Sequence, residues 1–272
     1  MGVDAQIDEI GPWSEIKLEI ISKYARAYSS ILDKQGYFQH VYIDAFAGLG
    51  YHKSRETQEI VEGSPRLALE IEPPFKKYFF IDINGLRVRS LQEIAKSNVE
   101  AVTVYEGDCN SILVDEILPT IRYEDYVRGL CLLDPYGLHL DWKVIELAGS
   151  LKTTEVFLNF PIMDMNMNVL KHDLDRVDET QAARMSRFWG DDSWREIAYS
   201  KNLNLFGWEE KESNDRVVEE FCLRLRNIAG FNHVSRPLPM KNSRNSTVYY
   251  LIFASPKPVA LDIVDDIYKQ YE

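Results

Sequence analysis

The sequence is poor in cysteine and in positive charge. Its three cysteines, Cys109, Cys131 and Cys222, lie far apart without C-x-x-C spacing, so neither a disulfide framework nor a metal site is predicted. Lysine and arginine number 31 against 43 aspartates and glutamates, and the formal net charge is −12. Because phosphate binding is driven by clustered lysine and arginine, a nucleic-acid partner would require a local basic patch or a basic partner protein.

Long apolar runs and a secretory leader are also missing. The N-terminal segment is acidic and amphipathic, and no basic stretch precedes an apolar run, which argues against a signal peptide. No apolar run reaches the roughly 20 residues that span a membrane. The 272 residues are 45% hydrophobic, enough for one sizeable core, with or without a small lobe. Together with the cysteine usage, these features predict a cytoplasmic protein without membrane association.

Short apolar strands alternate with amphipathic helices over residues 1–160. Strands are predicted at 41–46, 77–82, 101–106, 130–134 and 155–160, and helices at 13–32, from Pro65, and at 86–97, 110–118 and 141–151. This alternation is typical of an α/β fold in which helices cover both faces of a mostly parallel sheet. Residues 51–62 are predicted to be a polar loop, longer than most connections between a strand and a helix.

The alternation stops at Pro161. Residues 161–210 are rich in methionine, asparagine, aspartate and tryptophan, and we predict two or three short helices there, forming an insertion or small lobe. The main domain then comprises residues 1–160 and 211–272. Its second part contains a helix at 215–229, strands at 233–239 and 247–254 joined by a basic turn, and a final helix at 259–271.

The first strand ends in an acid that is followed by a glycine turn. Asp44 closes the apolar run, and Gly48 and Gly50 follow; glycines allow the backbone to approach a nucleotide-like cofactor closely. A G-x-G-x-x-G dinucleotide motif is absent because Lys53 occupies the third position. The simpler alternative is an ordinary glycine pair in a turn.

A second acid, Asp82, ends the next strand. In a Rossmann-type sheet an acid at this point hydrogen-bonds the ribose hydroxyls, about 20 residues after the glycine loop. Here the separation from Asp44 is 82 − 44 = 38 residues, and the polar segment 51–62 accounts for the excess. The alternative is that Asp82 caps the helix that follows.

Two motifs resemble the class I S-adenosylmethionine-dependent methyltransferases. Asp44-Ala-Phe-Ala-Gly-Leu-Gly50 is similar to the D-x-F-x-G-x-G cofactor loop of their adenine-N6 subset, and Asp134-Pro-Tyr136 is similar to its D-P-P-Y loop. The resemblance implies a Rossmann-like sheet of seven mostly parallel strands with an antiparallel last strand, and S-adenosylmethionine as cofactor.

More narrowly, the chain resembles the three-Cys-motif partner proteins. The segments that carry this resemblance are Trp13-x-x-Ile-Lys17-Leu, Tyr42-Ile-Asp-Ala-Phe-Ala-Gly48, Gly63-Ser-Pro65, Leu133-Asp-Pro-Tyr-Gly137 with Asp141-Trp142, and Tyr249-Tyr-Leu-Ile-Phe-Ala-Ser255. The resemblance implies a three-Cys-motif protein as a partner. It does not indicate a substrate.

The resemblance also implies a set of cofactor-binding residues. They are Asp44, Phe46, Gly48, Gly50, Asp82 and Asp108. Asp44 would accept a hydrogen bond from the methionine ammonium, and Asp108 would face the adenine amino group. A structural alternative exists for Asp108, as the N-cap of a helix at Asn110. Lys17 on the first helix could reach the cofactor carboxylate.

The chemistry is assigned to Asp134, Pro135 and Tyr136. An exocyclic amino group is a weak nucleophile because its lone pair is delocalised, and acceptors for its two protons favour a more reactive geometry. Asp134 and the Pro135 carbonyl would be those acceptors, while Tyr136 would stack on a flipped-out base. Only one proline precedes Tyr136, so the aromatic residue is displaced by one position. The alternative is a strand end with a Pro-Tyr-Gly turn.

Other polar and aromatic residues have two interpretations each. The basic clusters are His52, Lys53 and Arg55, and Arg236, Lys241 and Arg244; each is either a solvated surface or part of a nucleic-acid footprint. Likewise, the tryptophans at 142, 189, 194 and 208 belong either to the core or to a base-stacking surface. The Met-rich stretch 163–167 could face a partner.

The sequence therefore predicts methyl transfer to an amino nitrogen of a nucleic-acid base, most simply adenine N6. Two alternatives stay open. The chain could be a methyltransferase-fold partner subunit that binds cofactor and acts with another protein, or it could methylate a small molecule or peptide. Fold analogy alone does not separate these options.

Overall fold

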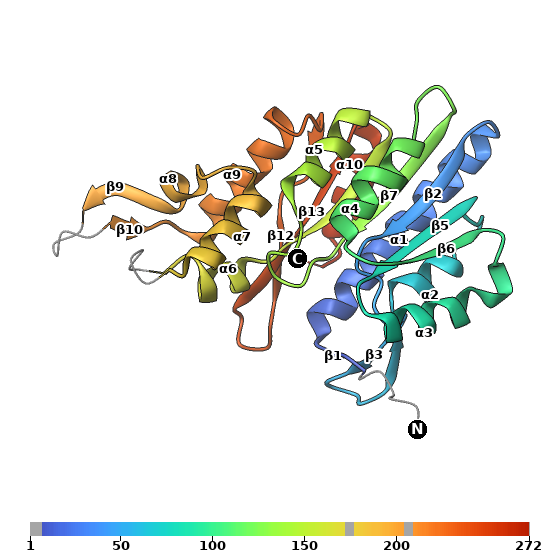
Figure 1. Ribbon diagram of the computed structural model, residues 1–272, viewed down its shortest axis with the longest axis horizontal. Helices are drawn as coiled ribbons and strands as arrows, with labels where there is room; N and C mark the ends of the chain where they lie inside the picture. The colour runs from blue at the N-terminus through green and yellow to red at the C-terminus, as the bar shows by residue number, and fades with distance from the viewer. Residues whose placement is uncertain (1–6, 172–176, 204–208, 272) are drawn as a thin grey trace.

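The computed structural model describes residues 7–171, 177–203 and 209–271. Its centre is an eight-stranded sheet with helices on both faces (Figure 1). The strands, in spatial order, are β6 (Val102–Glu106), β5 (Lys77–Asp82), β2 (Gln39–Asp44), β7 (Val127–Leu133), β8 (Thr154–Phe160), β13 (Thr247–Ser255) and, along the outer edge of β13, β11 (His233–Val234) and β12 (Leu238–Lys241). The five neighbouring strands β6, β5, β2, β7 and β8 are parallel to one another, and β13 is antiparallel to β8. The predicted mostly parallel α/β sheet and its antiparallel last strand are confirmed.

The sheet has eight strands where seven were predicted, because the predicted strand 233–239 is interrupted. Between β11 and β12, Ser235 N donates to Phe253 O at 2.8 Å and Ser235 Oγ accepts from Phe253 N at 3.0 Å. Pro237 follows and has no N–H to donate to the ladder. One predicted edge strand is therefore present as two short ones.

Alternating side chains along the strands build a separate core on each face of the sheet. Val41 and Ile43 lie in one cluster of buried residues, and the intervening Tyr42 lies in the other, as the two-residue period of a strand requires. Helices α1 (Pro12–Gln35), α2 (Ser64–Leu69), α3 (Gly85–Ala95) and α10 (Pro258–Tyr268) supply the Tyr42 side, while α4 (Cys109–Ile112), α5 (Trp142–Leu151) and α9 (Asn214–Asn227) supply the other. None of the described helices is long and apolar enough to cross a membrane.

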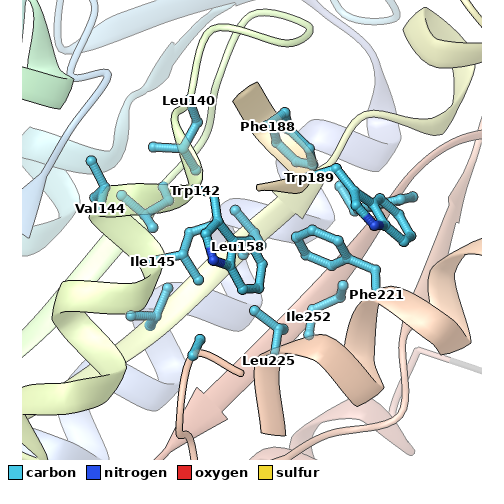
Figure 2. Close-up of a cluster of buried hydrophobic side chains, with 14 of the residues drawn as sticks. Leu140, Trp142, Val144, Ile145, Leu158, Phe188, Trp189, Phe221, Leu225 and Ile252 are labelled. Carbon is cyan, nitrogen blue, oxygen red and sulfur yellow. The ribbon is translucent and has the colours of Figure 1, made fainter. Parts of the chain in front are cut away.

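The segment after β8 shares the core of the sheet. It contains α6 (Ile162–Asn168), α7 (Glu179–Trp189), α8 (Trp194–Ala198) and an antiparallel pair, β9 (Tyr199–Leu203) with β10 (Glu209–Lys211), which lie at one end of the molecule (Figure 1). Trp142 and Trp189 pack against Phe221 in this core (Figure 2), and Trp194 is buried in the same cluster. These tryptophans are therefore core residues rather than base-stacking ones. Trp208 lies outside the described residues.

The predicted polar loop 51–62 is wrong in part, because most of it forms strands. β3 (Tyr51–Ser54) pairs with β4 (Ile60–Glu62), and β1 (Glu9–Ile10) pairs in parallel with β3. The strands are short and polar, so they lack the apolar alternation that identifies a strand in sequence. This small sheet brings the N-terminal segment to the carboxyl ends of the main strands.

Candidate functional site

The candidate site lies where the strand order of the main sheet reverses. β5 and β6 follow β2 on one side, whereas β7 and β8 lie on the other side. In open α/β sheets ligands bind outside the carboxyl ends of the strands at such a switch point. Asp44 ends β2, and Asp134 directly follows β7. The two acid-ended motifs of the sequence are therefore brought together.

Two cavities open at this point, and Phe46 and Tyr136 line both. The larger has a volume of about 660 Å³ and is also lined by Gly48, Asp134 and Pro135. The smaller, of about 380 Å³, includes the remaining pair of predicted acids, Asp82 and Asp108. Asp44 and Gly50 line neither cavity.

Gly48 and Gly50 serve different purposes in the loop after β2. Both have positive φ, +64° and +79°. A Cβ at Gly48 would meet no atom within 4 Å, whereas a Cβ at Gly50 would lie 2.4 Å from Cδ1 of Ile94. Gly48 therefore leaves the cavity open, and Gly50 is required by the packing of α3.

Asp82 holds two loops together at the end of β5. Its Oδ2 accepts from Gly48 N at 3.0 Å and its Oδ1 accepts from Asn84 N at 2.8 Å. Asn84, not Asp82, caps α3, because its side chain accepts from Leu86 N. Asp82 is buried and lies on the smaller cavity as the ribose interpretation requires.

Asp108 is the N-cap of α4, as the structural alternative predicted. Its Oδ1 accepts from the Asn110 backbone N at 3.2 Å and from Asn110 Nδ2 at 3.0 Å. The same Asn110 side chain donates to His139 O and accepts from Asp141 N. The smaller cavity is therefore bounded by loops that these hydrogen bonds hold together.

Asp44 is fully buried beneath the site. Oδ1 accepts from Phe46 N at 3.2 Å, and Oδ2 accepts no hydrogen bond of normal geometry from a described residue. Burial raises the pKa of Asp44 to about 7, against the opposing influence of the nearby Ser64 hydroxyl and the Phe46 N–H. Ser64 is free for this contact because Gly63 occupies the N-cap of α2.

Asp134 has partners on both of its oxygens. Oδ2 forms an ion pair with Lys17 Nζ on α1, and Oδ1 accepts from Asn159 Nδ2 at 2.7 Å. Burial by itself would lower the pKa of Lys17, but the Asp134 carboxylate holds it well above its usual value. Lys17 Nζ also lies 5.4 Å from the centroid of the Tyr249 ring. The sequence had indicated Lys17 as a cofactor contact, and the structure places it on Asp134.

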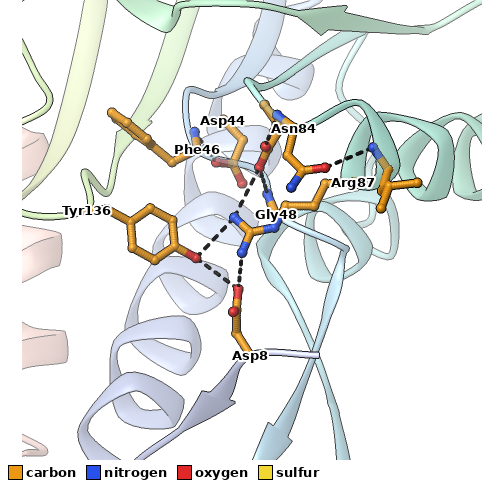
Figure 3. A network of polar contacts seen from close by, with 9 residues as sticks. Asp8, Asp44, Phe46, Gly48, Asn84, Arg87 and Tyr136 are labelled. Atoms are coloured by element: carbon orange, nitrogen blue, oxygen red, sulfur yellow. Dashed lines mark hydrogen bonds and ion pairs between the residues drawn. The ribbon is translucent and has the colours of Figure 1, made fainter. Parts of the chain in front are cut away.

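Tyr136 is tied to the N-terminal segment and to α3 (Figure 3). Its hydroxyl donates to Asp8 Oδ2 at 2.9 Å, which also accepts from Arg87 Nη2 at 2.7 Å. The Arg87 guanidinium lies 5.5 Å from the Tyr136 ring centroid, and Nη1 is 3.7 Å from Asp82 Oδ2. Burial raises the pKa of Tyr136 to about 12. Sequence reasoning missed Asp8 and Arg87, because Asp8 is 128 residues away from Tyr136 in the chain.

The lining of the larger cavity carries more acids than bases. Its charged residues are Asp8, Glu9, Asp134 and Asp164 against Lys17 and Arg55. His52 also lines it, and burial lowers the pKa of His52, so the imidazole is neutral at pH 7. Of the second basic cluster, Lys241 and Arg244 line neither cavity. Among the described residues no cluster of acids, histidines and cysteines could hold a metal ion.

No protein-family model matches the chain, and no curated protein matches it. The resemblance to three-Cys-motif partner proteins therefore stays a prediction from sequence. Among solved structures, protein LPL1258 from Legionella pneumophila, of family DUF519, has a TM-score of 0.53 and 10% identity, with 93% of this chain and 92% of that chain covered. This likeness shows a shared fold over nearly the whole chain.

Two further solved structures are more distant. One is the DszA carbon methyltransferase, with a TM-score of 0.38 and 14% identity, covering 81% of this chain and 48% of that one. The other concerns the conversion of a disulfide bond into a thioacetal group during echinomycin biosynthesis, with a TM-score of 0.33 and 13% identity, covering 89% and 87%.

Proposed function

We propose that this chain is an S-adenosylmethionine-dependent methyltransferase that transfers a methyl group to an amino nitrogen. The observation that carries the proposal is the arrangement at the switch point of the sheet. The glycine loop after β2 and the Asp134-Pro-Tyr136 loop after β7 border one cavity, and Phe46 and Tyr136 are shared with a second cavity that contains Asp82 and Asp108.

The residues present fit the parts of this cofactor. The smaller cavity would hold the nucleoside, with Asp82 on the ribose hydroxyls and the exposed side chain of Ile83 beside the adenine. The open space over Gly48 leads to the larger cavity, which would hold the amino-acid part. Asp44, whose buried Oδ2 accepts no hydrogen bond of normal geometry from a described residue, would favour a positive charge near this loop.

Bound there, S-adenosylmethionine supplies an electrophilic methyl group on a positively charged sulfur. The acceptor lone pair would take this methyl group, the C–S electron pair would stay on sulfur, and one N–H proton would have to be accepted. The protein contributes by positioning and by accepting that proton. Asp134 is the carboxylate of the predicted loop, and Lys17 and Asn159 hold it in place.

The exocyclic amino group of adenine in DNA or RNA is the first candidate acceptor. Tyr136 supports it, because its side chain is half exposed at the edge of both cavities, where a flipped-out base could stack. An amine of a small molecule or peptide is the second candidate. The excess of acids over bases in the larger cavity favours this second candidate, because a phosphate backbone would be repelled there.

Calorimetry with S-adenosylmethionine and S-adenosylhomocysteine tests the cofactor. We expect binding by the wild-type chain and by Asp134→Asn, and transfer of a labelled methyl group to oligonucleotides or amines by the wild type alone. No binding at millimolar ligand would overturn the proposal. Loss of binding and transfer together in Asp134→Asn would make Asp134 structural. Binding without transfer until a three-Cys-motif protein is added would identify a partner-dependent subunit.

A further inference from the structure

Two buried oxygen atoms on the larger cavity receive no hydrogen bond from any residue that the structure describes. They are Oδ1 of Asn159 and Oδ2 of Asp164, and both residues line the cavity. A buried acceptor without a donor costs free energy, so such atoms are rare and require an explanation. Both of these oxygens are acceptors, which indicates an occupant that brings donors; the third such atom on this cavity, His52 Nδ1, can donate or accept according to its tautomer.

Asn159 is held in one orientation by Asp134 of the Asp134-Pro-Tyr136 loop. It is the penultimate residue of β8, and its Nδ2 donates to Asp134 Oδ1 at 2.7 Å. That hydrogen bond commits the amide nitrogen to Asp134 and leaves the amide oxygen unpaired. Asp134 Oδ2 is engaged by Lys17, so both oxygens of the Asp134 carboxylate have protein partners, whereas Asn159 Oδ1 and Asp164 Oδ2 have none among the described residues.

Asp164 lies against the residue that follows Tyr136. It belongs to α6, and its Oδ1 accepts from Asn168 Nδ2 at 2.8 Å, which leaves Oδ2 without a donor. A Cβ at Gly137 would come within 2.6 Å of Asp164 Oδ2. Only glycine allows the carboxylate to approach the loop so closely, and the φ of +58° at Gly137 disfavours other residues as well.

Part of the lining of the larger cavity is apolar. Met163 and Met167 on α6 and Val248 on β13 line the same cavity, and 61% of the Met167 surface is exposed. Flexible methionine side chains adapt to the shape of a bound group. An apolar wall beside two unpaired acceptors suits a molecule with an apolar or aromatic body and an amino group.

We propose that Asn159 and Asp164 bind the amino group of the methyl acceptor, so that its N–H bonds are received by Asn159 Oδ1 and Asp164 Oδ2. This inference rests on the proposed function and adds the residues that select the acceptor. The substrate class is a primary amino group with two N–H donors on an apolar or aromatic body. Replacing both hydrogens by methyl groups leaves the two buried acceptors unpaired, so a dimethylated amine is rejected.

Matched probe pairs test this assignment on protein saturated with S-adenosylhomocysteine, which blocks the cofactor site. The pairs are adenosine with N6,N6-dimethyladenosine, and aniline with N,N-dimethylaniline, all of which carry a neutral amino nitrogen at pH 7. We expect the wild-type chain to bind the primary amine of one pair at least about tenfold more tightly than its dimethyl partner, the discrimination that a hydrogen bond to a charged group provides. In Asp164→Asn this ratio falls, while the affinity for S-adenosylhomocysteine is unchanged.

A control variant with the same Asp→Asn change elsewhere, together with a stability measurement, distinguishes a ligand-binding role of Asp164 from a structural one. Asp266→Asn, at an exposed position on α10 whose carboxylate pairs with Lys269, should leave the ratio intact. Asp164→Asn should unfold at the same or a higher urea concentration than wild type, because a residue kept for a ligand does not stabilise the empty fold. Lower stability with intact discrimination would make Asp164 structural and overturn the assignment.

The two proposals fail in different ways. If S-adenosylhomocysteine does not bind, the proposed function fails. If it binds but the wild-type chain does not distinguish either amine from its dimethyl partner, the roles of Asn159 and Asp164 are wrong, and the proposed function stands.

Discussion

Lys17 and Asp134 form an ion pair across 117 residues of the chain and join α1 to the loop after β7. The Lys17 side chain is 8% exposed and that of Asp134 27%. Neither charge is well hydrated, so each depends on the other for compensation. The pair therefore fixes the position of the Asp134 carboxylate on the larger cavity.

Replacing Lys17 with methionine should therefore be costly. Removing one partner of a buried ion pair leaves an uncompensated charge and lowers the free energy of unfolding. Because Asp134 is partly exposed, we expect a loss of about 3 kcal/mol, the lower end of the usual range for such pairs. The double variant Lys17→Met/Asp134→Asn should regain part of this stability. Urea unfolding of the wild type, the two single variants and the double variant measures the coupling. If the stability losses of the two single variants add up to that of the double variant, the ion pair is hydrated enough to contribute nothing to stability.

The parallel strands of the fold were predictable because each contains an apolar run that is visible in the local sequence. The strand 77–82 was predicted with the bounds that the structure shows, since its buried apolar run ends in an acid. The interruption at Ser235 was not predictable, because it depends on a hydrogen bond to Phe253 in the neighbouring strand. The strands β3 and β4 were missed because they are short, and because the pairing of β3 with β1 joins residues more than 40 positions apart (53 − 9 = 44).

The candidate site was predictable where motifs border it and not where distant segments meet. Phe46, Gly48 and Asp134 line the larger cavity because each lies at the end of a strand or in the loop directly after it. Arg87 and Asp8 carry no motif, and only the three-dimensional contact with Tyr136 shows them. The alternative for Asp108 was correct because capping is a local property of the chain.

Stability should fall as the pH rises from about 4 to about 7. Burial raises the pKa of Asp44 from 3.8 to about 7 and that of Glu155 from 4.5 to about 7. For both groups the pKa in the folded protein is higher than the pKa in the unfolded chain. Their contribution to folding stability is therefore complete below the unfolded pKa and is lost as the pH rises through the folded pKa. Thermal melts across this range measure the effect.

The two acids lie at opposite ends of the parallel strands, which provides an internal control. Asp44 ends β2, whereas Glu155 is near the start of β8, where its Oε1 accepts from Ser255 Oγ at 3.0 Å. Asp44→Asn and Glu155→Gln should each flatten the pH dependence, and only Asp44→Asn should weaken cofactor binding. An unchanged pH profile in both variants would show that these carboxyls titrate normally.

Substitutions of Tyr136 should separate its ring from its hydroxyl. Tyr136→Phe removes the hydrogen bonds to Asp8 and Arg87 but keeps the aromatic face, so we expect a stability loss of about 1 kcal/mol and retained transfer. Tyr136→Ala should lower the rate of methyl transfer by at least about tenfold, because this matches the free energy that one base contributes by stacking on an aromatic ring. Equal loss in both variants would assign the role of Tyr136 to its hydroxyl network. Steady-state kinetics with whichever acceptor the labelled-methyl assay identifies makes the comparison.

Gly48 offers the sharpest separation of cofactor binding from folding, because the chain contains a matched control. Gly48 and Gly36 have positive φ values of +64° and +72°, and a Cβ at either position would meet no atom within 4 Å. Alanine at each should therefore cost a similar amount of stability, about 1 kcal/mol, from the left-handed backbone alone. Gly36 caps the C-terminus of α1, whereas Gly48 lines the larger cavity. Calorimetry should show weakened S-adenosylhomocysteine binding in Gly48→Ala and wild-type binding in Gly36→Ala. Equal affinities in the two variants would mean that the bound cofactor does not pass over Gly48.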